Sequence, residues 1–136
     1  MIFGAGGQLG RELARIIPDS ISVYHTGEGE QIFADISDSD KVTTLIEKYS
    51  PEIVINASAI ANVDLCEKNR EAALSINGTA VNGIANACRE IGATLIHIST
   101  DYVFDGVRGN YTEKSIPNPI NFYNFQKRTL YHLKNS

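Results

Sequence analysis

A tyrosine and a lysine stand four positions apart near the end of the chain, at Tyr123 and Lys127. If this segment is helical, residues at that spacing share one face. A neighbouring ammonium group favours phenolate, so it lowers a tyrosine pKa that is ordinarily about 10 toward the range useful for acid–base catalysis. Two residues also share a helix face by chance, so the meaning of the pair depends on what the rest of the chain places beside it.

Hydroxyl and carboxyl groups gather upstream in the stretch STDYVFDG, which begins at Ser99. Thr100 could orient a carbonyl group beside the phenol of Tyr123. Asp105 is followed by a glycine, and this pair also suits a simple turn. With a nicotinamide dinucleotide bound next to them, Thr100, Tyr123 and Lys127 would form a site for hydride transfer.

A glycine-rich turn, GAGGQLG, follows the first apolar residues. Gly4, Gly7 and Gly10 recur every three residues, which departs from G-x-G-x-x-G but matches the looser G-x-x-G-x-x-G. Glycines permit a tight turn and close approach of the backbone to a pyrophosphate at a helix N-terminus. Because the turn lies between a predicted strand and a predicted helix, we expect these glycines, with Gln8 and Leu9, to bind a dinucleotide. The alternative is an ordinary strand-to-helix turn.

A second candidate segment, ADIS, follows another apolar run. The carboxylate of Asp35 could accept a hydrogen bond from an adenine amino group, and Ile36 could pack on the purine ring. The alternative is a helix start, with Ser37 as the cap.

Small residues follow the apolar run IVIN, at Ala57, Ser58 and Ala59. Short side chains at this place would let a cofactor lie flat over the end of the sheet. Ordinary packing between a helix and a strand explains them equally well. We expect these three residues to contact the cofactor.

The segment VYHTGEG is informative about the type of dinucleotide. No acidic residue ends the apolar run, where NAD-specific sites usually carry one to hold the ribose 2′-hydroxyl. No arginine stands there for a 2′-phosphate either, although His25 and Thr26 could contact one. We therefore expect NADPH, with NADH as the other possibility.

Apolar runs alternate with segments of helical period along the whole chain. Strands are predicted at residues 1–3, 20–25, 30–35, 51–59 and 92–100. Helices are predicted at residues 8–17, 37–49 (with Ser37 and Asp40 as a capping box) and 72–88, and a last one near Phe122. The alternation is typical of an α/β fold with a doubly wound, Rossmann-like parallel sheet, in which ligands bind beyond the carboxyl ends of the strands. The segments GAGGQLG, ADIS, NASA and STDYVFDG all lie at such ends.

The composition limits the classes of partner. Over 136 residues the net charge is −4, and no basic stripe appears, so we do not expect nucleic acid to be a partner. No apolar run approaches the roughly 20 residues of a membrane span. Neither cysteine, Cys66 or Cys88, has metal-ligand spacing around it, so both are interpreted as small buried hydrophobic residues in a reducing compartment. We expect one cytoplasmic domain spanning residues 1–136.

These stretches, together with NASAIANVDLCE, INGTAVN and IPNPINFYNFQK, resemble the extended short-chain dehydrogenase/reductase family in the family's order. The resemblance implies reduction of the 4-ketone of a nucleotide sugar by NADPH or NADH. Thr100 would polarise the carbonyl and Tyr123 would donate the proton. Lys127 would hold the nicotinamide ribose and tune the tyrosine, so Tyr123 and Lys127 would also contact the cofactor.

The chain departs from the family pattern after Tyr123. The family signature is Y-G-x-S-K, whereas Asn124 and Gln126 replace the Gly and Ser here. Family members are about twice as long, which predicts a domain incomplete at its C-terminus, without most of the substrate-binding half. The alternatives are a catalytically silent nucleotide-binding or regulatory subunit and a fragment that needs a partner. An unpaired edge strand and a long helix rich in small residues predict a homodimer.

Overall fold

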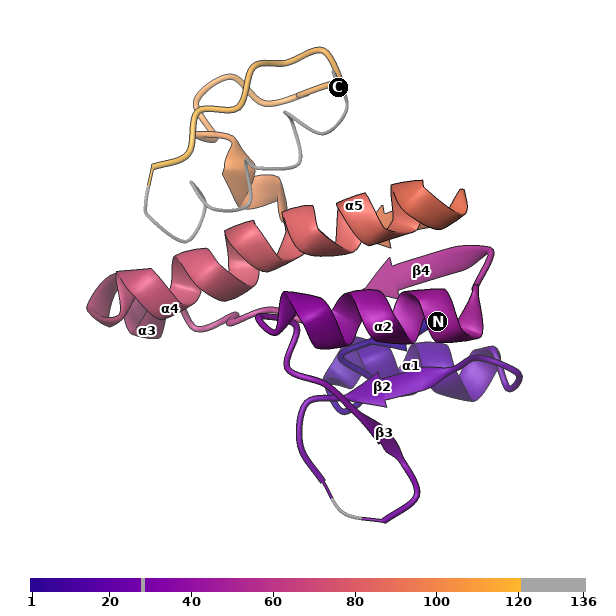
Figure 1. Ribbon diagram of the computed structural model, residues 1–136. Helices are drawn as coiled ribbons and strands as arrows, with labels where there is room; N and C mark the ends of the chain where they lie inside the picture. Colours follow the sequence, from indigo (N-terminus) through magenta and orange to yellow (C-terminus); the bar gives the residue numbers. More distant parts are fainter. Residues whose placement is uncertain (28, 121–136) are drawn as a thin grey trace.

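The computed structural model describes residues 1–27 and 29–120, and a parallel sheet lies at its centre (Figure 1). The strands are β1 (Ile2–Phe3), β2 (Ser22–Tyr24), β3 (Ile32–Phe33), β4 (Ile53–Asn56) and β5 (Thr94–His97). Their order is β3-β2-β1-β4-β5, and every pairing is parallel. The predicted doubly wound α/β fold is confirmed, with shorter strands than the apolar runs indicated.

The central strand, β1, sets the geometry of the sheet. Ile2 pairs with Ser22 of β2 on one side and with Ile55 of β4 on the other. The chain therefore runs outward through β2 and β3 in one direction, then returns and runs outward through β4 and β5 in the other. The carboxyl ends of all five strands meet at one edge, where a doubly wound sheet binds its ligands.

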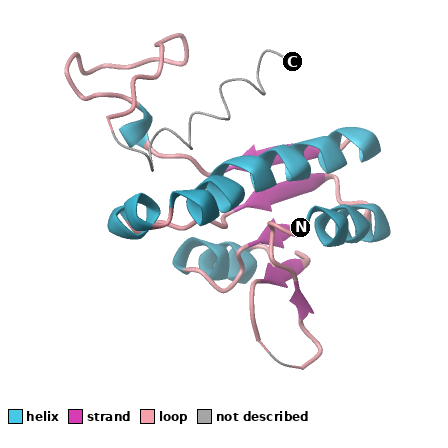
Figure 2. Ribbon diagram, turned by 60° about the vertical axis from the view of Figure 1, so that its left-hand side comes forward, coloured by secondary structure: helices cyan, strands magenta, loops and turns pink. Residues whose placement is uncertain are grey.

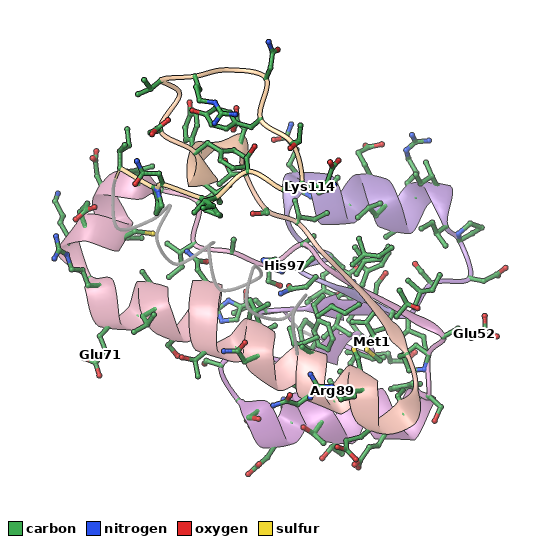
Figure 3. All side chains as sticks on the ribbon, turned by 90° about the horizontal axis from the view of Figure 1, so that it is seen from above. Met1, Glu52, Glu71, Arg89, His97 and Lys114 are labelled. Carbon is green, nitrogen blue, oxygen red and sulfur yellow. The ribbon has the colours of Figure 1, made fainter. Side chains whose placement is uncertain are left out.

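Helices cover the two faces of the sheet unequally (Figure 3), with α1 on one face and α2 and α5 side by side on the other. The helical segments are α1 (Gln8–Ile16), α2 (Ser39–Tyr49), α3 (Val63–Lys68), α4 (Arg70–Leu74), the π-helical η1 (Ser75–Thr79), α5 (Ala80–Ile91) and the 3-10 turn η2 (Asp101–Val103). The predicted helix at residues 72–88 corresponds to the continuous run of α4, η1 and α5 (Figure 2).

The hydrophobic core lies between the sheet and the pair α2 and α5. Val42 and Ile46 of α2 face Ile84 and Cys88 of α5, and all four are at most 2% exposed. Val54 of β4 is fully buried beneath them. This core packs α2 and α5 against the sheet, whose strand order places the loops after the strands at one edge. The expectation that Cys66 and Cys88 are small buried residues is confirmed.

The start of α2 differs from the prediction. Asp38 is the N-cap, and its carboxylate accepts a hydrogen bond from the backbone N–H of Lys41 at 3.0 Å. The predicted capping box of Ser37 and Asp40 is wrong, because the hydroxyl of Ser37 instead donates to Asp35 at 2.7 Å. Asp38 satisfies the helix start, so Ser37 can order the loop after β3.

The α1 face of the sheet is open beside β4 and β5. Ile53 is 47% exposed and Ile96 is 44% exposed, and the pairing register places them on the same face. An unbroken apolar run such as Ile53 to Ile55 is typical of a strand buried on both faces, and this expectation is wrong here, because in the part of the chain that the structure describes β4 is buried on one face only. Within that same part, no helix combines the length and the apolar character needed to cross a membrane.

Candidate functional site

The carboxyl edge of the sheet opens into a cleft of about 250 Å³. Its walls come from the segments that follow the first four strands and from η1. The lining residues are Gly4, Gly7, His25, Ala34, Asp35, Ile36, Ala57, Ser58, Ala59, Ile60 and Ile76. The structure thus brings together Gly4, Gly7, Asp35, Ile36, Ala57, Ser58 and Ala59 from the predicted cofactor residues.

Gly4 allows two walls of the cleft to approach each other. Its φ is +81°, and a Cβ atom placed on it would lie 2.8 Å from the backbone nitrogen of Ser58. The backbone N–H of Gly7 donates to the carbonyl of Gly4 at 3.0 Å and closes the turn. Gly7 is the N-cap of α1 and provides no side-chain cap. The amides of the first helical turn therefore have no acceptor from the cap and can bind an anion.

Gly10 packs the helix against the turn. A Cβ atom on Gly10 would lie 2.0 Å from the carbonyl oxygen of Gly4, so only glycine fits at this position in the first turn of α1. Gln8, Leu9 and Gly10 do not line the cleft. Their predicted contact with a cofactor remains a prediction, and it would run through backbone amides.

Asp35 is held in place by the loop that follows it. Its Oδ1 accepts hydrogen bonds from the backbone N–H of Ser37 at 2.9 Å and from the Ser37 hydroxyl at 2.7 Å. Its Oδ2 lies 3.4 Å from Nε2 of His25. The bonds from Ser37, with a smaller contribution from His25, lower the pKa of the Asp35 carboxyl. The group is therefore a fixed, ionised acceptor at neutral pH, while the adjacent Ile36 is largely buried and presents only part of its side chain.

Asn56, at the end of β4, organises the small residues that follow. It is fully buried, and its Oδ1 accepts a hydrogen bond from the backbone N–H of Ser58 at 3.0 Å. Its Nδ2 lies 3.1 Å from Nδ1 of His97 on β5. The side chain thus shapes the turn at Ala57 and ties it to the next strand. Asn56 is not among the residues predicted from the sequence, although an asparagine that ends an apolar strand is a usable signal.

Asn77 is a second structural residue that the sequence analysis did not assign. It lies in η1, is 1% exposed, and reaches a backbone 17 residues upstream. Its Oδ1 accepts from the N–H of Ile60 at 2.9 Å, and its Nδ2 donates to the carbonyl of Ile60 at 3.0 Å. Asn77 therefore pairs with both backbone groups of Ile60, as a residue of a neighbouring strand would, and holds this cleft-lining residue in place.

Thr100 follows β5 and does not line this cleft. It is the N-cap of η2, and its Oγ1 accepts from the N–H of Tyr102 at 3.3 Å while it donates to Asp101 at 3.2 Å. The predicted role of Thr100 at a substrate carbonyl remains a prediction. Its predicted partners, Tyr123 and Lys127, lie outside the residues that the structure describes.

A second cavity, of about 520 Å³, lies in the loop after β5, the orange segment of Figure 1. Asp105 lines this cavity and connects three parts of the loop. It accepts hydrogen bonds from the hydroxyl of Tyr111, the N–H of Val107 at 3.0 Å and the amide of Asn118 at 2.9 Å. These bonds, that from Tyr111 first, lower the pKa of Asp105 to about 2. The ring of Tyr111 stacks on Phe104 at 4.3 Å. Asp105 therefore orders the loop after β5 in addition to preceding the glycine of a turn.

Ligand chemistry at these sites rests on backbone amides, carboxylates and hydroxyls. Among residues 1–27 and 29–120, no group of three or more His, Cys, Asp and Glu side chains is placed to hold a metal ion. The arrangement of the first cleft suits an elongated ligand with an anionic centre next to Gly7 and a hydrogen-bond donor next to Asp35.

Known proteins match this chain over most of its length. The model of the RmlD substrate binding domain family matches residues 1–130. The dTDP-4-dehydrorhamnose reductase of Aggregatibacter actinomycetemcomitans is 38% identical over 128 residues, which are 93% of this chain and 43% of the relative. The methionine adenosyltransferase 2 subunit beta of Mus musculus is 37% identical over 132 residues, covering 90% of this chain and 38% of the relative.

A solved structure has a similar fold. The dTDP-4-dehydrorhamnose reductase of Bacillus anthracis str. Ames, in complex with NADP, superposes with a TM-score of 0.81 at 32% identity. The match covers 98% of this chain and 48% of that one. The chain thus spans about half the length of the relatives it matches.

Proposed function

This chain belongs to the RmlD substrate binding domain family, and on that premise we propose that it provides the dinucleotide-binding part of a reductase of the dTDP-4-dehydrorhamnose reductase type. The proposed reaction is reduction of the 4-ketone of a nucleotide sugar with NADPH, or with NADH. In this proposal residues 1–136 form a single Rossmann-like domain. The observation that carries it is the cleft in which the loops after β1, β3 and β4 bring together the glycine turn, Asp35 and Ala57 to Ala59.

The residues of the cleft fit a nicotinamide dinucleotide. Gly4 and Gly7 form a cradle beside the N-terminus of α1, where a pyrophosphate would accept hydrogen bonds from backbone amides. The ionised Asp35 would accept a hydrogen bond from the adenine amino group, with Ile36 against the purine. A bound NADPH would supply the hydride, while the small side chains of Ala57 and Ala59 leave room above the end of β4.

The proposed catalytic groups follow from the family resemblance. Thr100 would polarise the substrate carbonyl, and Tyr123 would donate the proton to the developing alkoxide. Lys127 would hold the nicotinamide ribose and lower the tyrosine pKa. The reductase names of the Aggregatibacter and Bacillus relatives support this choice of reaction.

Titration calorimetry with NADPH tests the proposal. The parent chain should bind NADPH, and Gly7→Val should weaken binding at least about tenfold, because its side chain would occupy the place of the pyrophosphate. Gly83→Ala, in α5 and outside this cleft, is the control and should bind as the parent does. Equal affinity of Gly7→Val and the parent would contradict the proposed site.

A catalytically silent nucleotide-binding or regulatory subunit is the second candidate function. It is favoured by the methionine adenosyltransferase subunit, whose identity to this chain is close to that of the reductase. Binding of NADPH without turnover of dTDP-4-dehydrorhamnose would support this candidate over the first.

We further propose a cytoplasmic homodimer. The two buried cysteines suit a reducing compartment. Among residues 1–27 and 29–120, β5 is the last strand of the sheet, and its edge and the exposed apolar face beside it support association with a second copy.

A further inference from the structure

Three adjacent loops line the adenosine end of the proposed cofactor cleft. Strands β1, β2 and β3 are neighbours in the sheet, so the segments after them lie in the same order along its carboxyl edge. The segment after β1 supplies Gly7, that after β2 supplies His25, and that after β3 supplies Asp35. If the pyrophosphate lies at Gly7 and the adenine at Asp35, the ribose between them lies against His25.

His25 follows directly on β2, and its ring is placed by Asp35. Its Nε2 lies 3.4 Å from Oδ2 of Asp35, whose other oxygen is held by two hydrogen bonds from Ser37. The His25 side chain is 67% exposed, so it remains open to a ligand. The imidazole is thus oriented by a fixed carboxylate and faces the cleft.

The chemistry at this position differs from that of a site selective for NAD. An acid at the end of β2 would accept hydrogen bonds from the ribose hydroxyls and repel a 2′-phosphate. Here the residue is an imidazole, whose other ring nitrogen, not directed at Asp35, can donate a hydrogen bond to a phosphate oxygen when it carries a proton. Its Nε2 lies 3.4 Å from Oδ2 of Asp35, so the ring covers part of that carboxylate.

We propose that His25 selects NADPH over NADH by donating a hydrogen bond to the 2′-phosphate of the adenosine ribose. This inference rests on the proposed function, because it requires a dinucleotide in the cleft. In this proposal the side chain of His25, positioned by Asp35, determines which of the two cofactors binds more tightly.

The test compares dissociation constants for NADPH and NADH in four proteins by titration calorimetry. The parent should bind NADPH more tightly than NADH. His25→Ala should weaken NADPH binding about tenfold, because a hydrogen bond to a charged group is lost and Asp35 is uncovered. Its affinity for NADH should stay within about twofold. His25→Gln retains a donor and should recover part of the preference for NADPH.

Lys41→Ala removes an exposed cation of α2 that does not line the cleft, and it should bind both cofactors as the parent does. Equal weakening of NADPH and NADH in His25→Ala, or no change in either, overturns the role of His25 and leaves the proposed function standing. Failure of the parent to bind either dinucleotide overturns both. Because His25 is exposed, a thermal melt of each variant should match that of the parent.

Discussion

A Cβ atom on Gly10 would lie 2.0 Å from the carbonyl oxygen of Gly4. The contact would join the first turn of α1 to the turn after β1, and no rotamer change can relieve it, because the position of a Cβ is fixed by the backbone and its partner is a backbone carbonyl. The spacing of these glycines therefore reflects packing of the helix on the strand as much as binding of a ligand. Gly4 and Gly7 line the cleft, whereas Gly10 lets the helix come close enough to form it.

Gly10→Ala should lower the free energy of unfolding by at least about 2 kcal/mol, because the helix must move away from the turn. Gly6→Ala is the matched control, since its Cβ would lie 3.6 Å from the ring of Tyr24, an ordinary contact. The control should change stability by less than about 0.5 kcal/mol. Urea unfolding followed by circular dichroism measures both, and equal stability of the two variants would refute this role for Gly10.

Asn77→Ala should destabilise the fold and loosen the cleft. It leaves the N–H of Ile60 without its side-chain acceptor and the carbonyl of Ile60 with the weak donor Cys66 Sγ at 3.4 Å, at an expected loss of about 2–3 kcal/mol. Asn86→Ala removes an exposed side chain of α5 that accepts a bond from Arg89, and it should lie within about 0.5 kcal/mol of the parent. Hydrogen exchange at the Ile60 amide should accelerate in the first variant alone, and unchanged exchange there would contradict the assignment.

The stability of the chain should depend on Asp105 in acid. Its pKa is lowered to about 2 in the folded chain, below an unfolded value of about 3.9. A depressed pKa contributes stability that is fully present above the unfolded value and is lost as the pH falls toward 2. Asp35 acts in the same direction, because its pKa is also lowered.

Denaturant unfolding at a series of pH values between about 5 and 2 checks this dependence. Asp105→Asn should flatten the fall in stability over that window. Tyr111→Phe should flatten it less, because the bonds from Val107 and Asn118 remain. A slope in Asp105→Asn as steep as in the parent would show that the carboxylate does not contribute.

Tyr123→Phe tests the proposed proton donor. The variant should lose at least about a hundredfold in turnover of dTDP-4-dehydrorhamnose, because no other group is expected to protonate the alkoxide. The dissociation constant for NADPH should stay within about twofold of the parent value. Tyr49→Phe, on α2, is the control for loss of a phenol elsewhere. Full turnover in Tyr123→Phe would remove this residue from the mechanism.

Sedimentation equilibrium at micromolar concentrations should give a dimer mass for the parent. In the described part of the chain β5 is the last strand of the sheet, and Ile96 on its open face is 44% exposed. Ile96→Lys should weaken association through this region, because a charge would enter an apolar contact. Glu71→Lys, an exposed change on α4, controls for the added charge. A monomer mass at all concentrations would contradict the homodimer.

Local patterns in the sequence were sufficient to predict the fold class and most of the residues that line the cleft. Alternation of apolar runs with helical periods predicted the parallel sheet, because each pattern reports which faces of its own segment are buried. The rule that ligands bind at the carboxyl ends of such strands then selected Gly4, Gly7, Asp35 and Ala57 before any contact was known. These inferences needed only local pattern and one topological rule.

Contacts between segments far apart in the chain could be identified only from the folded structure. The bonds of Asn77 to Ile60 and the pairing of Asn56 with His97 connect residues 17 and 41 positions apart, and no local pattern encodes such a distance. The contact of His25 with Asp35 likewise exists only because β2 and β3 are neighbours in the sheet. Even the choice of Asp38 over Ser37 as helix cap depended on Asp35 engaging the serine hydroxyl. The sequence shows which side chains can form hydrogen bonds, but the order of the strands determines which of them lie close enough to do so.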